Sequence, residues 1–143
     1  MALYQVMAVF LCLVFAGLAA FHFYWAAGGR LAVHGALPAV GDRPLFEPGP
    51  LATAAVGCAL VAAVIISALR GGLLVLDLPE SLSHVGIWGL ALAFAARAIG
   101  EFRYVGFFEQ VRDTVFARRD SLVYSPLCVL ISALSAGLGA LAP

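Results

Sequence analysis

Apolar residues along the chain gather into four long segments that are separated by shorter polar connections. Each segment has about the length that a helix needs to cross a hydrocarbon layer, roughly 20 residues. Because hydrocarbon offers no partner for unpaired backbone groups, such segments are expected to be helical. The pattern predicts an all-α fold, a four-transmembrane-helix bundle in a single integral membrane domain over residues 1–143, with helices at about 3–27, 51–69, 82–100 and 126–142.

Residues that break or begin helices mark the ends of these segments. Gly28 and Gly29 end the first apolar segment. The connection that follows, residues 28–50, contains four prolines, which favour an extended, turn-rich loop, and whether this loop acts as a lid is left open. Ser125 and Pro126 form a typical N-cap and first-turn pair, so the fourth helix is expected to begin there.

The connection between the third and fourth segments has a helical pattern of its own. Apolar residues recur at helical spacing, and charged residues lie between them. A short amphipathic helix of this kind rests on a membrane surface with its apolar face in the headgroup region. The pattern therefore predicts a cytoplasmic interfacial helix over about residues 105–117.

Composition excludes a soluble domain and argues against nucleic acid as a partner. Hydrophobic residues make up 64% of the chain, charged residues make up 11%, and the mean hydropathy is +1.04. Acidic and basic residues both number eight, so the formal net charge is zero. The basic residues are all arginine, and most lie in or beside the first and third connections. By the positive-inside rule these two connections are expected in the cytoplasm, with both termini outside.

Polar side chains concentrate where the first and third helices end and the fourth begins. Since neighbouring helices alternate in direction, these three places are expected at the same cytoplasmic membrane face. An ionisable residue at membrane depth is costly and usually faces the bundle interior or an aqueous cavity. The candidate binding residues are therefore His22, Tyr24, Trp25, Arg97, Glu101, Arg103, Tyr104, Asp120 and Tyr124.

This polar cluster is open to three interpretations. Arg97 is placed to pair with Glu101 four residues later, with Asp120 across helices, or with a lipid phosphate. The cluster is then a salt-bridge network that joins the helix ends, a site for an anionic or polar head group, or a catalytic site. In the catalytic case Glu101 and His22 would serve as the acid/base pair.

No metal site and no cofactor are expected. No His, Cys or carboxylate follows any of the three histidines at a spacing of three or four residues. Helix rise separates His22 from His84 by roughly 20 Å of membrane depth. One haem therefore cannot take both as axial ligands.

Three runs of sequence resemble an uncharacterised family of small bacterial four-helix membrane proteins, catalogued as a domain of unknown function. The runs are HFYWAAGG, RAIGEFRYVGFF and FARRDSLVYSPLC. The family pattern joins H-x-Y-W-x-x-G-G, R-x-x-G-acid-F, and an acid followed by Y-S/T-P-L-C. The resemblance implies the four-helix fold and the bacterial inner membrane, and it implies no activity. The matching positions are His22, Tyr24, Trp25, Gly28, Gly29, Arg97, Gly100, Glu101, Phe102, Asp120, Tyr124 and Pro126.

Three classes of function follow from these observations. The favoured one is a non-enzymatic protein that binds a membrane lipid or another amphiphile at the cytoplasmic face, or that serves as an accessory subunit of a membrane-protein partner or homo-oligomer. The alternative is a small enzyme that acts on a lipid-soluble substrate through Glu101 and His22. A third, weaker alternative is an oligomeric transporter.

Overall fold

The computed structural model of the chain describes residues 1–33, 36–40, 43–100, 104–108, 110 and 114–143. Four helices in these ranges are long and apolar enough to cross a membrane: α1 (Leu3–Ala26), α2 (Pro50–Arg70), α3 (Glu80–Ile99) and a helix over Val115–Leu141. The chain is therefore a multi-pass membrane protein. The predicted all-α fold with four membrane-length helices is confirmed.

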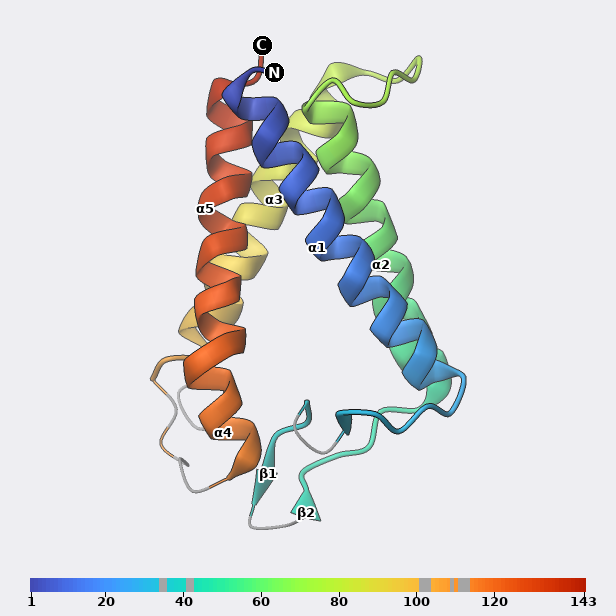
Figure 1. Cartoon of the computed structure of the whole chain (residues 1–143), viewed down its shortest axis with the longest axis vertical. Coiled ribbons are helices and arrows are strands. Elements are labelled where there is room, and N and C mark those ends of the chain that lie inside the picture. The colour runs from blue at the N-terminus through green and yellow to red at the C-terminus, as the bar shows by residue number, and fades with distance from the viewer. Residues whose placement is uncertain (34–35, 41–42, 101–103, 109, 111–113) are drawn as a thin grey trace.

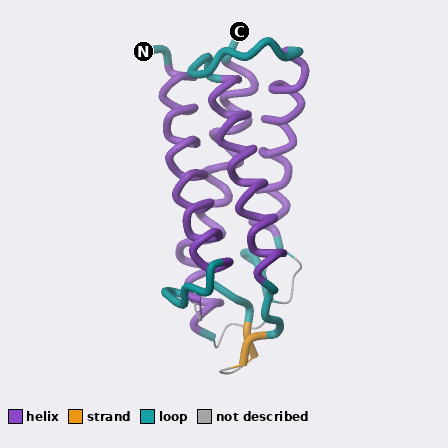
Figure 2. Tube along the Cα trace, turned by 90° about the vertical axis from the view of Figure 1, so that its right-hand side faces the viewer, coloured by secondary structure: helices purple, strands orange, loops and turns teal. Residues whose placement is uncertain are grey.

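The fourth membrane-length helix has three consecutive parts. They are α4 (Val115–Arg119), the π-helix η2 (Asp120–Tyr124) and α5 (Ser125–Leu141). In the connection between α1 and α2, the two-residue strands β1 (Ala39–Val40) and β2 (Arg43–Pro44) pair antiparallel. Figure 2 shows these strands at the opposite end of the bundle from the two chain termini.

The helices form two hairpins. α1 packs chiefly on α2, and α3 packs chiefly on α5. Both termini lie at one end of the molecule, called the terminal end below, and α4 and the strands lie at the other, called the Asp120 end (Figure 1). The hairpins are close together at the terminal end and diverge toward the Asp120 end (Figure 1).

Contacts between the two hairpins come from small residues and a ring pair. Gly86 of α3 lies so close to Ile66 of α2 that an added Cβ would be 3.0 Å from Ile66 Cδ1. The rings of Phe15 and Phe94 have centroids 5.5 Å apart. Such close approach lets helices gain van der Waals contact without a hydrophobic driving force. The buried core that results is formed by Ala8, Leu11, Phe15, Ala63, Ile87, Ile131, Leu138 and Ala142.

Arg70, at the end of α2, ties the two hairpins together at the terminal end. Its Nη1 donates to the backbone oxygen of Pro143 at 2.6 Å. Its Nη2 donates to the carbonyls of Ala142 at 2.7 Å and Gly139 at 3.2 Å. The guanidinium thus satisfies carbonyls at and just beyond the C-terminal end of α5, where a positive charge is also favoured by the helix dipole.

Replacing Arg70 with alanine should lower the free energy of unfolding by about 2 kcal/mol, because charge-assisted hydrogen bonds to carbonyls are lost. Denaturant titration in mixed micelles measures this change. Arg30→Ala is the matched control, since Arg30 is an exposed arginine at the opposite end of the same hairpin. Equal effects of the two substitutions would show that the contacts of Arg70 contribute nothing beyond its charge.

The interfacial helix expected over about residues 105–117 is not confirmed. Residues 104–108 form bends and turns, and residues 109 and 111–113 lie outside the described part of the chain. Gly106 has a φ of +93°, which is incompatible with a right-handed helix. Among the described residues after α3, helix begins at Val115, in α4.

Candidate functional site

The Asp120 end of the second hairpin is organised around one ion pair. Arg97 lies in the last turn of α3, and Asp120 is the first residue of η2. Arg97 Nη2 is 2.7 Å from Asp120 Oδ1, the Asp120 side chain is fully buried, and the Arg97 side chain is 34% exposed. Of the partners considered from the sequence for Arg97, the structure therefore shows Asp120.

The other carboxylate oxygen of Asp120 is also occupied. Asp120 Oδ2 accepts from the backbone N–H of Gly106 at 2.6 Å and from the Ser125 hydroxyl at 3.2 Å. A buried carboxylate is tolerated only when such donors replace its water. Arg97, Gly106, Asp120 and Ser125, called the Asp120 clasp below, thereby join the end of α3, the turn after it and the start of α5.

Two glycines build the turn that brings Gly106 to the carboxylate. Gly100 has a φ of +77° and Gly106 a φ of +93°. The two lie against each other's backbone, so that a Cβ on Gly106 would be 2.5 Å from the carbonyl oxygen of Ile99. The N–H of Phe107 donates to the carbonyl of Ala98 at 2.9 Å, which closes the turn back onto α3.

The prediction that Ser125 caps the start of a helix is wrong. Ser125 lies within a continuous helix, its backbone N–H donates to the carbonyl of Asp120 five residues earlier, and its hydroxyl donates to Asp120 Oδ2. Pro126 lacks an N–H and its ring clashes with a carbonyl one α-helical turn before it. A wider π-turn is one way in which a helix accommodates such a residue. The residue that caps this helix is Thr114, whose side chain accepts from Ala117 N–H at 3.0 Å.

The aromatic residues at the end of α1 fix the chain that follows it. Trp25 Nε1 donates to the carbonyl of Leu31 at 2.8 Å, and the Leu31 N–H donates to Tyr24 Oη at 3.4 Å. His22 is engaged within its own helix, where Nδ1 donates to the carbonyl of Leu18 at 2.8 Å. Its ring also lies 5.3 Å from that of Trp25.

The structure does not bring all of the candidate residues together. No hydrogen bond, ion pair or ring contact among the described residues joins His22, Tyr24 or Trp25 to the Asp120 clasp. Glu101 and Arg103 lie outside the described residues. Two further candidates are close to the clasp, since Tyr104 lies in the turn after α3 and Tyr124 ends η2, with its ring 6.1 Å from that of Phe116.

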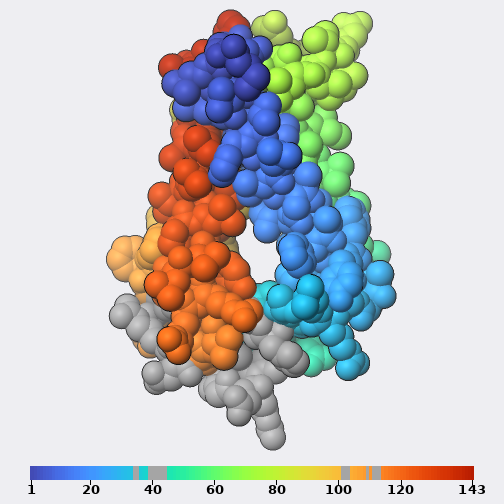
Figure 3. Space-filling view, viewed as in Figure 1, coloured from blue at the N-terminus to red at the C-terminus, as the bar shows by residue number. Residues whose placement is uncertain are grey.

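Between the two groups lies an open space, called the lateral opening below. In the space-filling view it separates the lower half of α1 from α4 and the lower half of α5 (Figure 3). It is bounded at the terminal end by the contact of α1 with α5 and at the Asp120 end by the segment that follows α1 (Figure 3). The lateral opening therefore reaches the side of the bundle, which faces lipid in a membrane.

Helical spacing places apolar residues of α5 on the side of this opening. Gly137, whose added Cβ would be 3.3 Å from Met7, marks the face of α5 that meets α1. Helical spacing continues that face through Leu134, Leu130 and Leu127. Leu134 and Leu127 pack against the core, whereas Leu130 is 43% exposed. Leu127, Leu130 and Leu134 are called the wall of the opening below. They continue the face of α5 that contacts α1 toward the Asp120 end.

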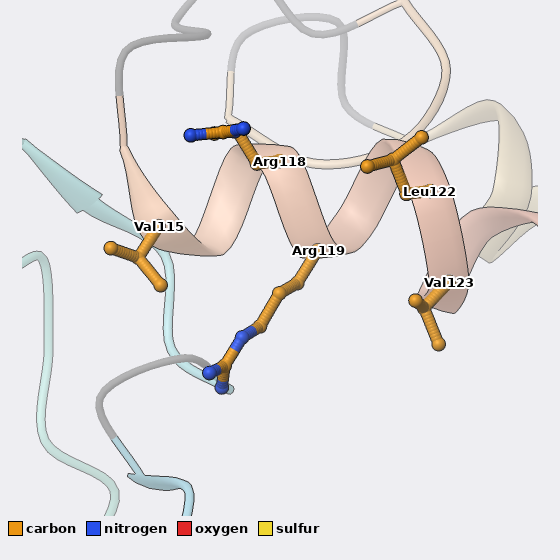
Figure 4. Close-up of a pocket in the computed structure, with 5 residues that line it drawn as sticks. All are labelled: Val115, Arg118, Arg119, Leu122 and Val123. Carbon is orange, nitrogen blue, oxygen red and sulfur yellow. The ribbon is translucent and has the colours of Figure 1, made fainter.

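One face of α4 and η2 carries a shallow pocket of about 290 Å³. Its lining is apolar apart from two arginines (Figure 4). The Arg119 side chain points toward the segment that links α1 to β1, and the Arg118 side chain points to the opposite side of the helix (Figure 4). The lining residues are Val115, Arg118, Arg119, Leu122 and Val123.

A family model described as "Protein of unknown function (DUF3995)" matches residues 5–135. The chain belongs to this family. The expected membership of an uncharacterised family is thereby confirmed, and the match includes the Asp120 clasp, the aromatic end of α1 and the wall of the lateral opening. No curated protein and no solved structure matches the chain.

Sequence reasoning missed the arginine pair of α4 as a site feature within this family domain. Arg118 and Arg119 contributed there only to the expected topology, because the helix was expected to end near residue 117. The signal that could have revealed the pair is local. Val115 lies four residues before Arg119, and Leu122 and Val123 lie four residues after Arg118 and Arg119.

Proposed function

We propose that the protein binds an amphiphile, a membrane lipid or a lipid-like molecule, with its apolar chain in the lateral opening. The observation that carries this proposal is the divergence of the two hairpins, which leaves an opening between α1 and α5 (Figures 1 and 3). In a bilayer such a space is filled, and the molecules around it are lipids. A ligand that is already dissolved in the membrane enters sideways without crossing water.

The two ends of the opening match the two ends of an amphiphile. Toward the bundle middle lie apolar contacts between the hairpins, such as the Phe15–Phe94 ring pair, and such surroundings suit a hydrocarbon chain. At the Asp120 end stand Trp25 and Arg119, residue types that favour the interface between hydrocarbon and water. A bound amphiphile would therefore lie with its head group at the Asp120 end.

The proposal includes an orientation in the membrane. Seven of the eight arginines lie in or beside the two connections at the Asp120 end, and only Arg70 lies at the terminal end. This imbalance supports an Asp120 end that faces the cytoplasm, in the bacterial inner membrane, and an amphiphile drawn from the cytoplasmic leaflet.

Catalysis and transport are not part of this proposal. Among the described residues, Asp120 accepts from Arg97, Gly106 and Ser125, and His22 donates to its own helix. Glu101 lies outside the described residues, so its proposed role as acid or base stays a prediction from the sequence. The accessory-subunit role also stays open, because a helix of a partner protein could fill the same opening.

Filling the lateral opening should displace the amphiphile. Leu130→Trp adds a large ring to its wall and is expected to lower the amount of lipid that stays bound through purification by about tenfold, since overpacking an occupied space costs about 1–3 kcal/mol. Native mass spectrometry of protein extracted in mild detergent measures the bound lipid directly.

Val129→Trp is the matched control. Val129 is 47% exposed, Leu130 is 43% exposed, and one residue of helix turns the added ring by about 100°. Val129 is thereby turned away from the opening, so its substitution should leave lipid retention unchanged. Equal retention in both variants, or no lipid on the unaltered protein, would reject the proposal, and a retained protein in place of lipid would favour the accessory-subunit role.

A further inference from the structure

We infer that the bound amphiphile is an anionic phospholipid and that Arg119 binds its phosphate-bearing head group. This inference rests on the proposed function, because it assigns the chemical class of the molecule in the lateral opening. It adds a head-group site on α4, on a residue that belongs to neither the Asp120 clasp nor the aromatic end of α1.

Position is the first argument. Arg119 precedes Val123 by four residues, and both line the pocket. Both belong to the same continuous helix as Leu130, which helical spacing places on the side of the opening. Figure 4 shows the Arg119 side chain extended toward the segment that links α1 to β1, which bounds the opening at this end. A head group held there leaves its chains next to the apolar wall.

Charge is the second argument. Asp120 directly follows the arginine pair, and its carboxylate would neutralise them if it were free. Instead the Asp120 side chain is fully buried, with Arg97 at 2.7 Å on one oxygen and two further donors on the other. Among the described residues, no ion pair joins Arg118 or Arg119 to an acid. Arg119 therefore offers its positive charge to a ligand.

The chemistry of the surroundings is the third argument. The three remaining lining residues, Val115, Leu122 and Val123, are all exposed apolar side chains. Valine and leucine contribute nothing to the capture of a free anion from water, whereas they suit the glycerol and upper chain region of a lipid. Guanidinium groups bind phosphate with two parallel hydrogen bonds, and basic pockets at helix ends recognise anionic head groups.

The test compares two lipids that differ only in head-group charge. The purified full chain is titrated with phosphatidylglycerol and with phosphatidylcholine of the same acyl composition, and bound lipid is counted by native mass spectrometry. One arginine near a membrane surface contributes about a fivefold gain for an anionic lipid, so Arg119 should favour phosphatidylglycerol about fivefold. In the variant R119Q this preference should disappear, while phosphatidylcholine binding stays unchanged.

Arg30→Gln is the control, because it removes the same charge from an exposed arginine on the other hairpin. It should keep the preference for phosphatidylglycerol. Equal binding of the two lipids by the unaltered protein, or an equal loss of preference in Arg30→Gln, would overturn the inference and leave the proposed function intact. Displacement of the lipid by excess inorganic phosphate would also overturn it, in favour of a free-anion site. Binding of neither lipid would reject the proposed function itself.

Discussion

Replacing Asp120 with alanine should lower the free energy of unfolding by about 3 kcal/mol, because it leaves three donors of the clasp without an acceptor. Arg97 loses the carboxylate at 2.7 Å, and the Gly106 N–H and the Ser125 hydroxyl lose theirs. Breaking one side of a buried pair costs more than the pair contributes, since the remaining charge stays desolvated. Denaturant titration in mixed micelles gives this value.

Two further variants locate the source of this loss. Asp77→Ala removes an exposed acid at the terminal end and should change stability by less than about 0.5 kcal/mol. Ser125→Ala removes only the hydrogen bond of 3.2 Å and should cost about 1 kcal/mol. If Asp120→Ala behaved like Asp77→Ala, the carboxylate would not hold the second hairpin together.

The four membrane-length helices could be predicted because hydrocarbon imposes their length and helicity on any apolar segment. The continuous helix that leads through Ser125 into Pro126 could not be predicted. Ser125 and Pro126 form a common helix start, yet the backbone keeps its helix by widening one turn, so that Ser125 N–H reaches the carbonyl of Asp120. Whether a helix starts at a proline or widens around it depends on tertiary contacts, here those of Asp120, that no local pattern contains.

The candidate site was predicted in part for a similar reason. The sequence identified Arg97 and Asp120 but left Asp120, Glu101 and a lipid phosphate open as partners of Arg97. The structure shows the contact with Asp120, 23 residues away along the chain, and Glu101 lies outside the described residues. The aromatic residues of α1 were expected in the same cluster. They bind their own following turn through Leu31 instead.

No sequence pattern by itself predicts that the two hairpins diverge. Small residues that allow close helix contact occur throughout the chain, and which of them meet is decided by the packing of whole helices. Gly86 against Ile66 and Gly137 against Met7 hold the hairpins together at the terminal end. The separation at the other end, and with it the lateral opening, follows from that choice.

The second large effect is expected from Gly100→Ala, which should lower the free energy of unfolding by about 4 kcal/mol. Gly100 has φ +77° and ψ −169°, a region that is essentially open to glycine only and costs other residues about 1–3 kcal/mol. An added Cβ would also collide with the carbonyl oxygen of Val105. The turn would have to open, which moves Gly106 N–H away from Asp120 Oδ2 and loses that hydrogen bond as well.

Gly89→Ala in the middle of α3 separates this effect from glycine replacement in general. No atom lies within 4 Å of the position of an added Cβ at Gly89, and alanine is favoured over glycine inside a helix by about 1 kcal/mol. The two alanine substitutions on one helix should therefore move stability in opposite directions, down at Gly100 and slightly up at Gly89. A Gly100→Ala protein as stable as Gly89→Ala would mean that the turn after α3 does not depend on the left-handed glycine, and that the Asp120 clasp forms without it.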